Sequence, residues 1–143
     1  MVREASKLNP DIQFVEGNMV SLNMKSENLG AIVSFYSIIH LDRGELFKAR
    51  AEMRRVLRPN GFAVIAFHVG SNATHSSECW GHTVNLDATF FTSQEVIAQL
   101  TRAGFEIEAA AERDPYPDVE YQSRRGYILA TKRVPTYVRS TDE

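Results

Sequence analysis

The sequence is poor in features that mark several classes of protein. It has one cysteine, Cys79, so no disulfide can form within the chain and a reducing compartment is expected. Its net charge is -2, which lacks the positive excess that nucleic-acid binding requires. No apolar run approaches the roughly 20 residues that span a bilayer, and the N-terminus lacks a signal peptide's apolar segment. We expect a cytoplasmic protein that binds neither nucleic acid nor membranes.

The rest of the composition is that of an ordinary globular domain. The 143 residues are 43% hydrophobic and 24% charged, which is enough for one hydrophobic core but not for two. We therefore expect one domain over residues 1–133, followed by a flexible tail over residues 134–143.

Apolar runs and turn residues alternate along the chain. Three segments have helical periodicity or helix-end signals: Val2–Leu8, Glu45–Leu57 and Ser93–Ala103. Five short apolar segments have the pattern of strands: Ile12–Val15, Ala31–Tyr36, Phe62–Phe67, Phe105–Ala111 and Gly126–Thr131. Strands that alternate with helices predict an α/β fold with a largely parallel sheet, whose ligands bind at the carboxyl ends of the strands. Functional residues are therefore expected after Val15, Tyr36 and Phe67.

Three segments carry motifs that are found together in one family: Phe14–Met19, Ile32–Leu41 and Glu52–Phe62. The last is the most specific, because it reads E-M-R-R-V-L-R-P-N-G, with Asn60 where the family has a glycine. From Val2 to Arg133 the sequence resembles the class I methyltransferases, which use S-adenosylmethionine. The resemblance implies a Rossmann-like fold with the strand order 3-2-1-4-5-7-6.

The first elements of that family have no counterpart in the sequence. The family begins with a strand, a glycine-rich loop and a second strand that ends in a ribose-binding acid, whereas this chain contains no G-x-G. The resemblance thus implies a partial methyltransferase fold, with strands 3 to 7 and their flanking helices but without the first two strands. Strand 4, Ala31–Tyr36, is left with an open edge. Each backbone N–H or C=O group that is buried there without a partner would destabilise the fold by about 1–3 kcal/mol. We expect a homodimer through this edge; collapse of strand 3 onto it, or pairing with a separate segment, are the alternatives.

The resemblance also implies residues that bind the cofactor S-adenosylmethionine, in the loops after two strands. They are Gly17, Asn18, Met19, Phe35, Tyr36 and Ser37. Asn18 replaces an aspartate that accepts a hydrogen bond from the adenine, so its uncharged amide should bind more weakly. A simple turn at Gly17 and Asn18 is the alternative interpretation.

Histidines and aromatic residues are the candidates for the chemistry itself. The candidates for catalysis are His40, His68 and His82, and those for binding the acceptor are Trp80, Tyr116 and Tyr121. A histidine can accept a proton at neutral pH because its ordinary pKa is near 6.5. A zinc site formed by His75, Cys79 and His82, or a mobile surface loop over the same stretch, is the alternative, and we expect no metal. For His40, capping of its own loop is the alternative.

The sequence predicts a methyltransferase-like protein that moves a methyl group from S-adenosylmethionine to a small-molecule acceptor. Cofactor affinity should be impaired, because the residues that hold the ribose and the methionine are missing. The alternative is a non-catalytic protein of the same fold that dimerises, or docks on a partner, through its open sheet edge. A fragment of a longer enzyme is a third interpretation.

Overall fold

A computed structural model gives the fold and describes residues 1–79 and 81–134. The helices in the described part are α1 (Val2–Leu8), α2 (Arg43–Val56), α3 (Ser93–Arg102) and a short 3₁₀-helix, η1 (Ile38–His40). The strands are β1 (Leu29–Phe35), β2 (Leu57–His68), β3 (Ala73–Cys79), β4 (His82–Thr89), β5 (Phe105–Arg113) and β6 (Arg125–Lys132). The predicted α/β class is confirmed. None of the helices over the described ranges has the length and apolar character needed to cross a membrane.

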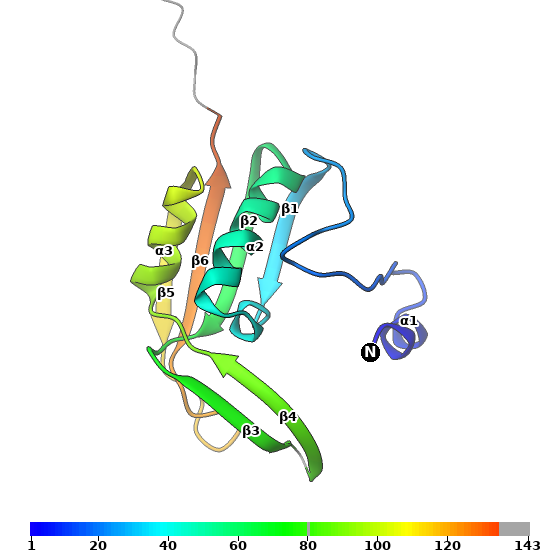
Figure 1. The fold of residues 1–143 in the computed structure, drawn as a ribbon, viewed down its shortest axis with the longest axis vertical. Helices are drawn as coiled ribbons and strands as arrows, with labels where there is room; N and C mark the ends of the chain where they lie inside the picture. Colours follow the sequence, from blue (N-terminus) through cyan, green and yellow to red (C-terminus); the bar gives the residue numbers. More distant parts are fainter. Residues whose placement is uncertain (80, 135–143) are drawn as a thin grey trace, which may run out of the picture.

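Four strands form the central sheet, in the order β1-β2-β6-β5 (Figure 1). Strands β1 and β2 are parallel, and β6 is antiparallel to both β2 and β5. Three of the four strands therefore run in one direction, and β1 and β2 end side by side. This is the 4-5-7-6 part of the strand order that the resemblance implies. The reversed direction of β6 is not visible in its apolar pattern, because a pattern of buried residues is the same in both directions.

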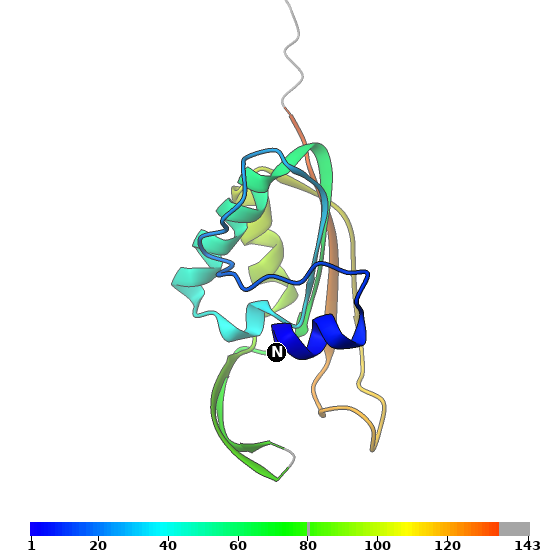
Figure 2. The same ribbon diagram turned by 90° about the vertical axis from the view of Figure 1, so that its right-hand side faces the viewer.

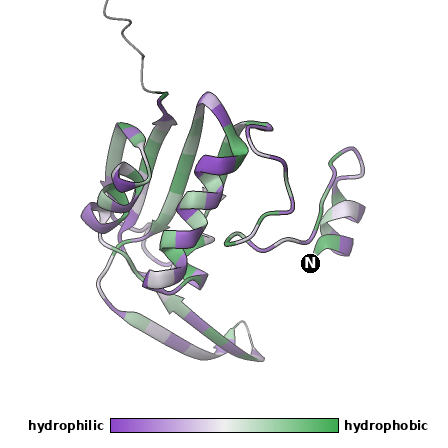
Figure 3. Ribbon diagram, turned by 45° about the horizontal axis from the view of Figure 1, so that its top comes forward, coloured by the Kyte–Doolittle hydropathy of each residue, from purple (hydrophilic) through white to green (hydrophobic). Residues whose placement is uncertain are grey.

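Helices α2 and α3 cover one face of this sheet (Figure 2). Each begins at a capping box, in which a side chain and a backbone amide of the first turn bond reciprocally, at Asp42 with Glu45 and at Thr92 with Glu95. The second box was predicted, and the first starts α2 two residues before the predicted position. Hydrophobic and hydrophilic residues alternate along α2, as an amphipathic helix on a core requires (Figure 3).

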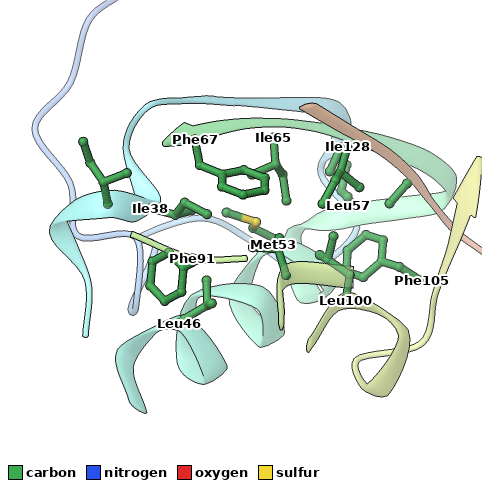
Figure 4. Packing of buried hydrophobic residues seen from close by; sticks show 14 residues of the cluster. Ile38, Leu46, Met53, Leu57, Ile65, Phe67, Phe91, Leu100, Phe105 and Ile128 are labelled. Carbon is green, nitrogen blue, oxygen red and sulfur yellow. The ribbon is translucent and has the colours of Figure 1, made fainter. Parts of the chain in front are cut away.

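The hydrophobic core lies between the sheet and these two helices (Figure 4). Phe67 of β2 is fully buried there, and burial of a large apolar side chain contributes about 1.5–3 kcal/mol. Gly126 of β6 lies directly against the Phe67 ring, because a Cβ at this position would come within 2.6 Å of Cζ. The close approach of β6 to β2 at this point thus depends on a glycine.

The predicted strand over Ile12–Val15 is wrong. These residues form no strand, and the side chains of Ile12 and Val15 are 56% and 64% exposed. A strand needs a neighbour to pair its backbone amides and carbonyls, and within residues 1–79 and 81–134 no strand lies beside this segment. As a result, β1 is an edge strand of the sheet.

The stretch after His68 is a β-hairpin and not the loop that the sequence suggested. Strands β3 and β4 pair in an antiparallel manner, with Cys79 opposite His82. Gly81 has a φ of 78°, a left-handed conformation that suits glycine in a tight hairpin turn. The hairpin leaves the carboxyl end of β2 and extends beyond the sheet (Figure 1). It therefore stands where the fold is expected to bind its ligands.

Candidate functional site

A pocket of about 240 Å³ lies between the hairpin and the carboxyl end of β2. It is lined by Ile39, His68, Thr74, Ser76, Cys79, Leu86, Ala88, Phe90 and Tyr121. Mostly apolar walls with a few polar groups are typical of small-molecule sites. Two residues predicted from the sequence, His68 and Tyr121, are thus brought into one pocket.

Aromatic rings surround the imidazole of His68. The Phe90 ring stacks on it at a centroid distance of 5.4 Å and an interplanar angle of 26°. The Tyr36 ring lies 5.0 Å away, and Tyr121 meets the imidazole edge-on at 5.6 Å. These are favourable distances for aromatic pairs, so the rings hold one another in place. The pocket has the walls to receive a flat ring.

Arg125 and Ser123 determine which nitrogen of His68 carries the proton. Arg125 Nη1 donates a hydrogen bond to Nδ1, and the Ser123 hydroxyl lies 2.6 Å from the same nitrogen. Because a guanidinium can only donate, Nδ1 is an acceptor and the proton of the neutral ring is on Nε2. Burial and the charge of Arg125 lower the pKa of His68 to about 4. His68 is therefore neutral at pH 7.

The Nε2 atom of His68 faces no partner of its own. It forms no hydrogen bond with any residue in the described ranges, and it is not among the polar atoms sealed from solvent there. An N–H group in this state is free to donate to a bound molecule. His68 thus offers the pocket a hydrogen-bond donor.

The carboxylate of Glu120 forms ion pairs with both Arg113 and Arg125. Arg113 donates to both carboxylate oxygens of Glu120, at 2.8 and 2.7 Å, and so lowers the pKa of Glu120 to about 2. Glu120 in turn lies 3.9 Å from Nε of Arg125. The Arg113 guanidinium also donates to the Tyr127 hydroxyl at 3.2 Å. The segment before β6 is therefore tied to the end of the sheet, which positions the partners of His68.

Tyr36, predicted to bind the cofactor, joins the same network. Its φ is 51°, a left-handed value that costs a non-glycine residue on the order of 1–3 kcal/mol. The Tyr36 hydroxyl lies 3.2 Å from that of Tyr127, and burial together with this contact raises its pKa to about 12. Tyr36 follows the end of β1, and its ring lies 5.0 Å from that of His68.

A second cleft, of about 230 Å³, runs along the free edge of β1. Two of the predicted cofactor-binding residues, Met19 and Ser37, line it together with Ile32 and Met53. The hydroxyl of Ser37 lies 2.7 Å from that of Ser34, another residue of its wall. The structure thus brings Met19 and Ser37, 18 positions apart in the sequence, to one cleft.

The other predicted cofactor-binding residues do not line this cleft. Asn18 Oδ1 accepts a hydrogen bond from the Val20 amide at 3.0 Å, so the turn that was the alternative interpretation is present at Asn18. Gly17 is exposed, with open space around its Cα. Phe35 is 66% exposed, and its ring packs edge-on against Tyr36.

The remaining candidates are dispersed. His40 ends η1 and is exposed, and His82 is exposed on the hairpin beside Cys79. Tyr116 is 61% exposed and lies 4.6 Å from the guanidinium of Arg113. Trp80 lies outside the described residues.

The side chains of the alternative zinc site are on the hairpin strands. His75 Nδ1 lies 2.8 Å from a carboxylate oxygen of Asp87, directly across the hairpin. Within the described ranges, no three His, Cys, Asp or Glu side chains are close enough to hold a metal ion. The geometry therefore favours a cross-strand pair at His75.

Sequence reasoning missed Phe90, Ser123 and Arg125 as residues of the site. His68 and Arg125 are 57 residues apart and meet because β6 pairs with β2 in a register that sets one directly opposite the other. The motif Arg125-Gly126-Tyr127 marks the start of β6 but not its register. Knowledge of the strand order and the register was the signal needed to find the pair.

Comparisons with known proteins agree with this architecture. A family model described as a methyltransferase domain matches residues 1–61. A search of curated proteins found no match. Among solved structures, a SAM-dependent methyltransferase from Methanosarcina mazei has a TM-score of 0.80 and 18% identity, covering 93% of this chain and 77% of that one.

Two further structures show the same similarity. A protein from Listeria monocytogenes described as an S-adenosylmethionine-dependent methyltransferase has a TM-score of 0.74 and 13% identity, covering 94% of this chain and 76% of that one. The 1,6-didemethyltoxoflavin-N1-methyltransferase of Burkholderia thailandensis, solved with 1,6-didemethyltoxoflavin and S-adenosylhomocysteine, has a TM-score of 0.68 and 16% identity, over 92% of this chain and 56% of that one. The chain is thus similar to S-adenosylmethionine-dependent methyltransferases: a methyltransferase-domain model matches residues 1–61, and the solved structures share the fold along the chain.

Proposed function

We propose that the protein transfers a methyl group from S-adenosylmethionine to a small-molecule acceptor. The observation that carries the proposal is the pocket at the carboxyl end of β2, where a neutral imidazole with a free N–H stands among aromatic rings. In this reaction an acceptor atom attacks the methyl carbon in line while the carbon–sulfur bond breaks. The protein's own task is to exclude water and to align the acceptor.

His68 acts in this proposal as a positioning residue. Its Nε2–H donates to a carbonyl oxygen or a ring nitrogen of the acceptor, while Phe90 and Tyr121 hold the flat part of the molecule. A base is a less suitable role for His68, because its other nitrogen is occupied by Arg125 and its pKa of about 4 makes it a weak proton acceptor. The acceptor is therefore a planar molecule that offers a hydrogen-bond acceptor atom.

The cleft along β1 holds part of the cofactor. S-Adenosylmethionine supplies the electrophilic methyl group when it is bound. The cleft walls suit the flat adenine, since Met19 and Ile32 are apolar and Ser37 offers a hydroxyl. No carboxylate lines the cleft in the described part of the chain, and its volume of about 230 Å³ falls below the roughly 300–1,000 Å³ of sites that enclose a whole ligand. In this proposal the residues of the cleft bind the adenine, and the ribose is bound only weakly.

Further residue assignments stay predictions. His40 and His82 are proposed for catalysis, and Tyr116 and Trp80 for binding of the acceptor, on the resemblance alone. Gly17, Asn18 and Phe35 are proposed for cofactor binding on the same ground. The cytoplasmic location also stays a prediction of the sequence.

Calorimetric titration of the full chain with S-adenosylhomocysteine tests the cofactor proposal. Replacement of Ser37 by Ala removes one hydroxyl from the cleft and should weaken binding about fivefold, which corresponds to about 1 kcal/mol for one hydrogen bond. Ser71→Ala is the matched control, because Ser71 is exposed outside the cleft. Absence of binding at millimolar concentration would overturn the proposal.

A second candidate function is assembly into a homodimer through the edge of β1. It is favoured by the exposure of Val33 and Phe35, which are 68% and 66% accessible on an edge strand. Two copies that pair along this edge would satisfy the unpaired backbone groups and cover the apolar side chains. Because Val33 also lines the cleft proposed for the cofactor, a dimer through this edge fits the non-catalytic interpretation better.

Sedimentation velocity measures this assembly directly. Wild type should sediment as a dimer at micromolar concentration, and Val33→Lys should shift it to the monomer by placing two charges at the shared edge. Val119→Lys is the control, since Val119 is 79% exposed on a loop before β6. A wild-type monomer at these concentrations would contradict the dimer.

A further inference from the structure

Four arginine side chains line a third hollow, between α2 and the end of α3. A pocket of about 390 Å³ between α2 and the end of α3 is lined by Phe47, Arg50, Ala51, Arg54, Arg55, Arg102 and Ala103. No carboxylate is among these lining residues in the described part of the chain. We call this hollow the arginine pocket. In an amphipathic helix the arginines ordinarily lie on the solvated face.

Arg50 departs most clearly from that expectation. Arg50 is only 5% exposed, and its guanidinium carbon lies 4.3 Å from the centroid of the Phe47 ring. Its Nε is sealed from solvent and has no hydrogen-bond partner within the described residues. Burial and the charge of Arg102 lower the pKa of Arg50, so the two cations are close enough to disfavour each other. The described residues provide no acceptor for this buried N–H group, which leaves it for a bound molecule.

The neighbouring arginines are equally without acidic partners, with one exception. Arg55 is paired with Glu52 at 2.8 Å, so its charge is already compensated. Neither Arg54 nor Arg102 forms an ion pair or a side-chain hydrogen bond with any residue between 1–79 or 81–134. Arg54 is held across the helices by contact with Gly104, where a Cβ would come within 2.8 Å of its Nε. Three uncompensated guanidinium groups, from two helices, therefore share one pocket.

The chemistry of this pocket selects a compact anion with more than one charge. Guanidinium groups present planar pairs of N–H donors that match the oxygens of a phosphate. A phosphate group can accept from several donors at once, whereas a single carboxylate offers two oxygens. The apolar side chains of Ala51 and Ala103 also line the pocket and leave the donor groups as its only charged contacts.

We propose that the arginine pocket binds the phosphate group of a small molecule, through Arg50, Arg54 and Arg102. The site is separate from the methyl-transfer pocket at the carboxyl end of β2, since the two share no lining residue. It goes beyond the proposed function and does not depend on it. A phosphate-bearing metabolite bound here would bridge α2 and α3, the two helices that cover the core.

Nuclear magnetic resonance titration of the full chain tests this site, with inorganic phosphate and glycerol phosphate as probes at constant low ionic strength. The arginine Nε–H signal of Arg50 should shift and saturate with both probes. Arg102→Gln and Arg54→Gln should each weaken binding at least tenfold, because each removes a charged donor. Arg58→Gln is the matched control, since Arg58 is exposed, carries the same charge and lies outside the pocket. It should change the affinity less than twofold.

Two comparisons keep the result specific. Sodium chloride at equal ionic strength should leave the Arg50 signal unchanged, and an identical shift would mean general screening and overturn the site. Tetraglutamate should bind at least tenfold more weakly than phosphate; equal or tighter binding would reject a phosphate ligand in favour of an acidic peptide segment. Saturation by inorganic phosphate but not by glycerol phosphate would identify the free ion as the ligand and reject an organic phosphate. Equal affinity of wild type and both arginine variants would also overturn the proposal.

Discussion

The pKa of His68 is the quantity that tests the geometry of the proposed site most directly. An ordinary histidine titrates near pH 6.5, whereas burial and the charge of Arg125 place the pKa of His68 at about 4. At pH 7 only about one His68 ring in a thousand should then be protonated. The pH dependence of the Cε1–H resonance measures this value, and the nitrogen shifts report the tautomer. A transition near pH 6.5, or a proton on Nδ1, would refute the hydrogen-bond assignment.

Substitution of Arg125 separates the two causes of the shift. Arg125→Gln keeps a donor near Nδ1 but removes the charge, so the pKa of His68 should rise and stay below 6.5, because burial is the larger cause. Arg124→Gln is the control with the same charge change, because Arg124 pairs with Glu112 and Asp114 and not with His68. A pKa that is equal in wild type and Arg125→Gln would contradict the proposed contact.

The same shift predicts how stability depends on pH. The pKa of His68 is lower in the folded chain than in the unfolded chain, so the unfolded chain binds more protons between about pH 4 and 6.5. The contribution of His68 is therefore complete above pH 6.5 and is lost as the pH falls towards 4. Full transmission of the shift corresponds to about 3 kcal/mol, and solvent screening of the half-buried ring reduces this to about 2 kcal/mol. Urea unfolding of wild type and His68→Phe at pH 7.5 and 4.5 measures the difference, and equal slopes with pH would argue against it.

Four substitutions test the packing that supports the site. Gly126→Ala should destabilise the fold by about 1–3 kcal/mol, because its Cβ would meet the buried Phe67 ring at 2.6 Å, and urea unfolding measures the loss. Leu100→Ala should cost about 2–5 kcal/mol by leaving a cavity, whereas Phe35→Ala, at an exposed ring, should cost less than about 1 kcal/mol in the same assay. Thr92→Ala should lower stability by about 1 kcal/mol through loss of the α3 cap, seen as a lower thermal midpoint; no change would mean that the capping box is redundant.

The role proposed for His68 also explains why charged residues lie beside the proposed site. Glu120 compensates two arginines, and one of them, Arg125, donates to Nδ1 of His68 and adds to the effect of burial in lowering its pKa. A neutral imidazole with a fixed tautomer is a directional donor, whereas a protonated one would present two donors and a charge. The buried Arg125 thus fixes the tautomer of His68, so that the pocket contains a hydrogen-bond donor at Nε2.

Helix ends and strand positions could be predicted from the sequence alone. Helix α3 was predicted to within one residue of its end, because Thr92, Glu95 and Gly104 are local signals that act within a turn or two. The strands at Ala31, Phe62, Phe105 and Gly126 were predicted from apolar segments bounded by turn residues. Burial of β1 on both faces was not confirmed, because Val33 and Phe35 are exposed. The family resemblance supplied the order of these strands.

Strand neighbours, strand register and contacts between distant residues could not be predicted from the sequence and became known from the structure. The segment Ile12–Val15 has strand-like residues but no neighbouring strand, so its pattern alone was misleading. The pairing of His68 with Arg125 follows from the register of β2 with β6, which no pattern within either strand specifies. The burial of Arg50 likewise follows from how α2 packs beside α3. Periodicity fixes which face of an element is apolar, but contacts between distant elements fix the charge, the tautomer and the partners of each functional side chain.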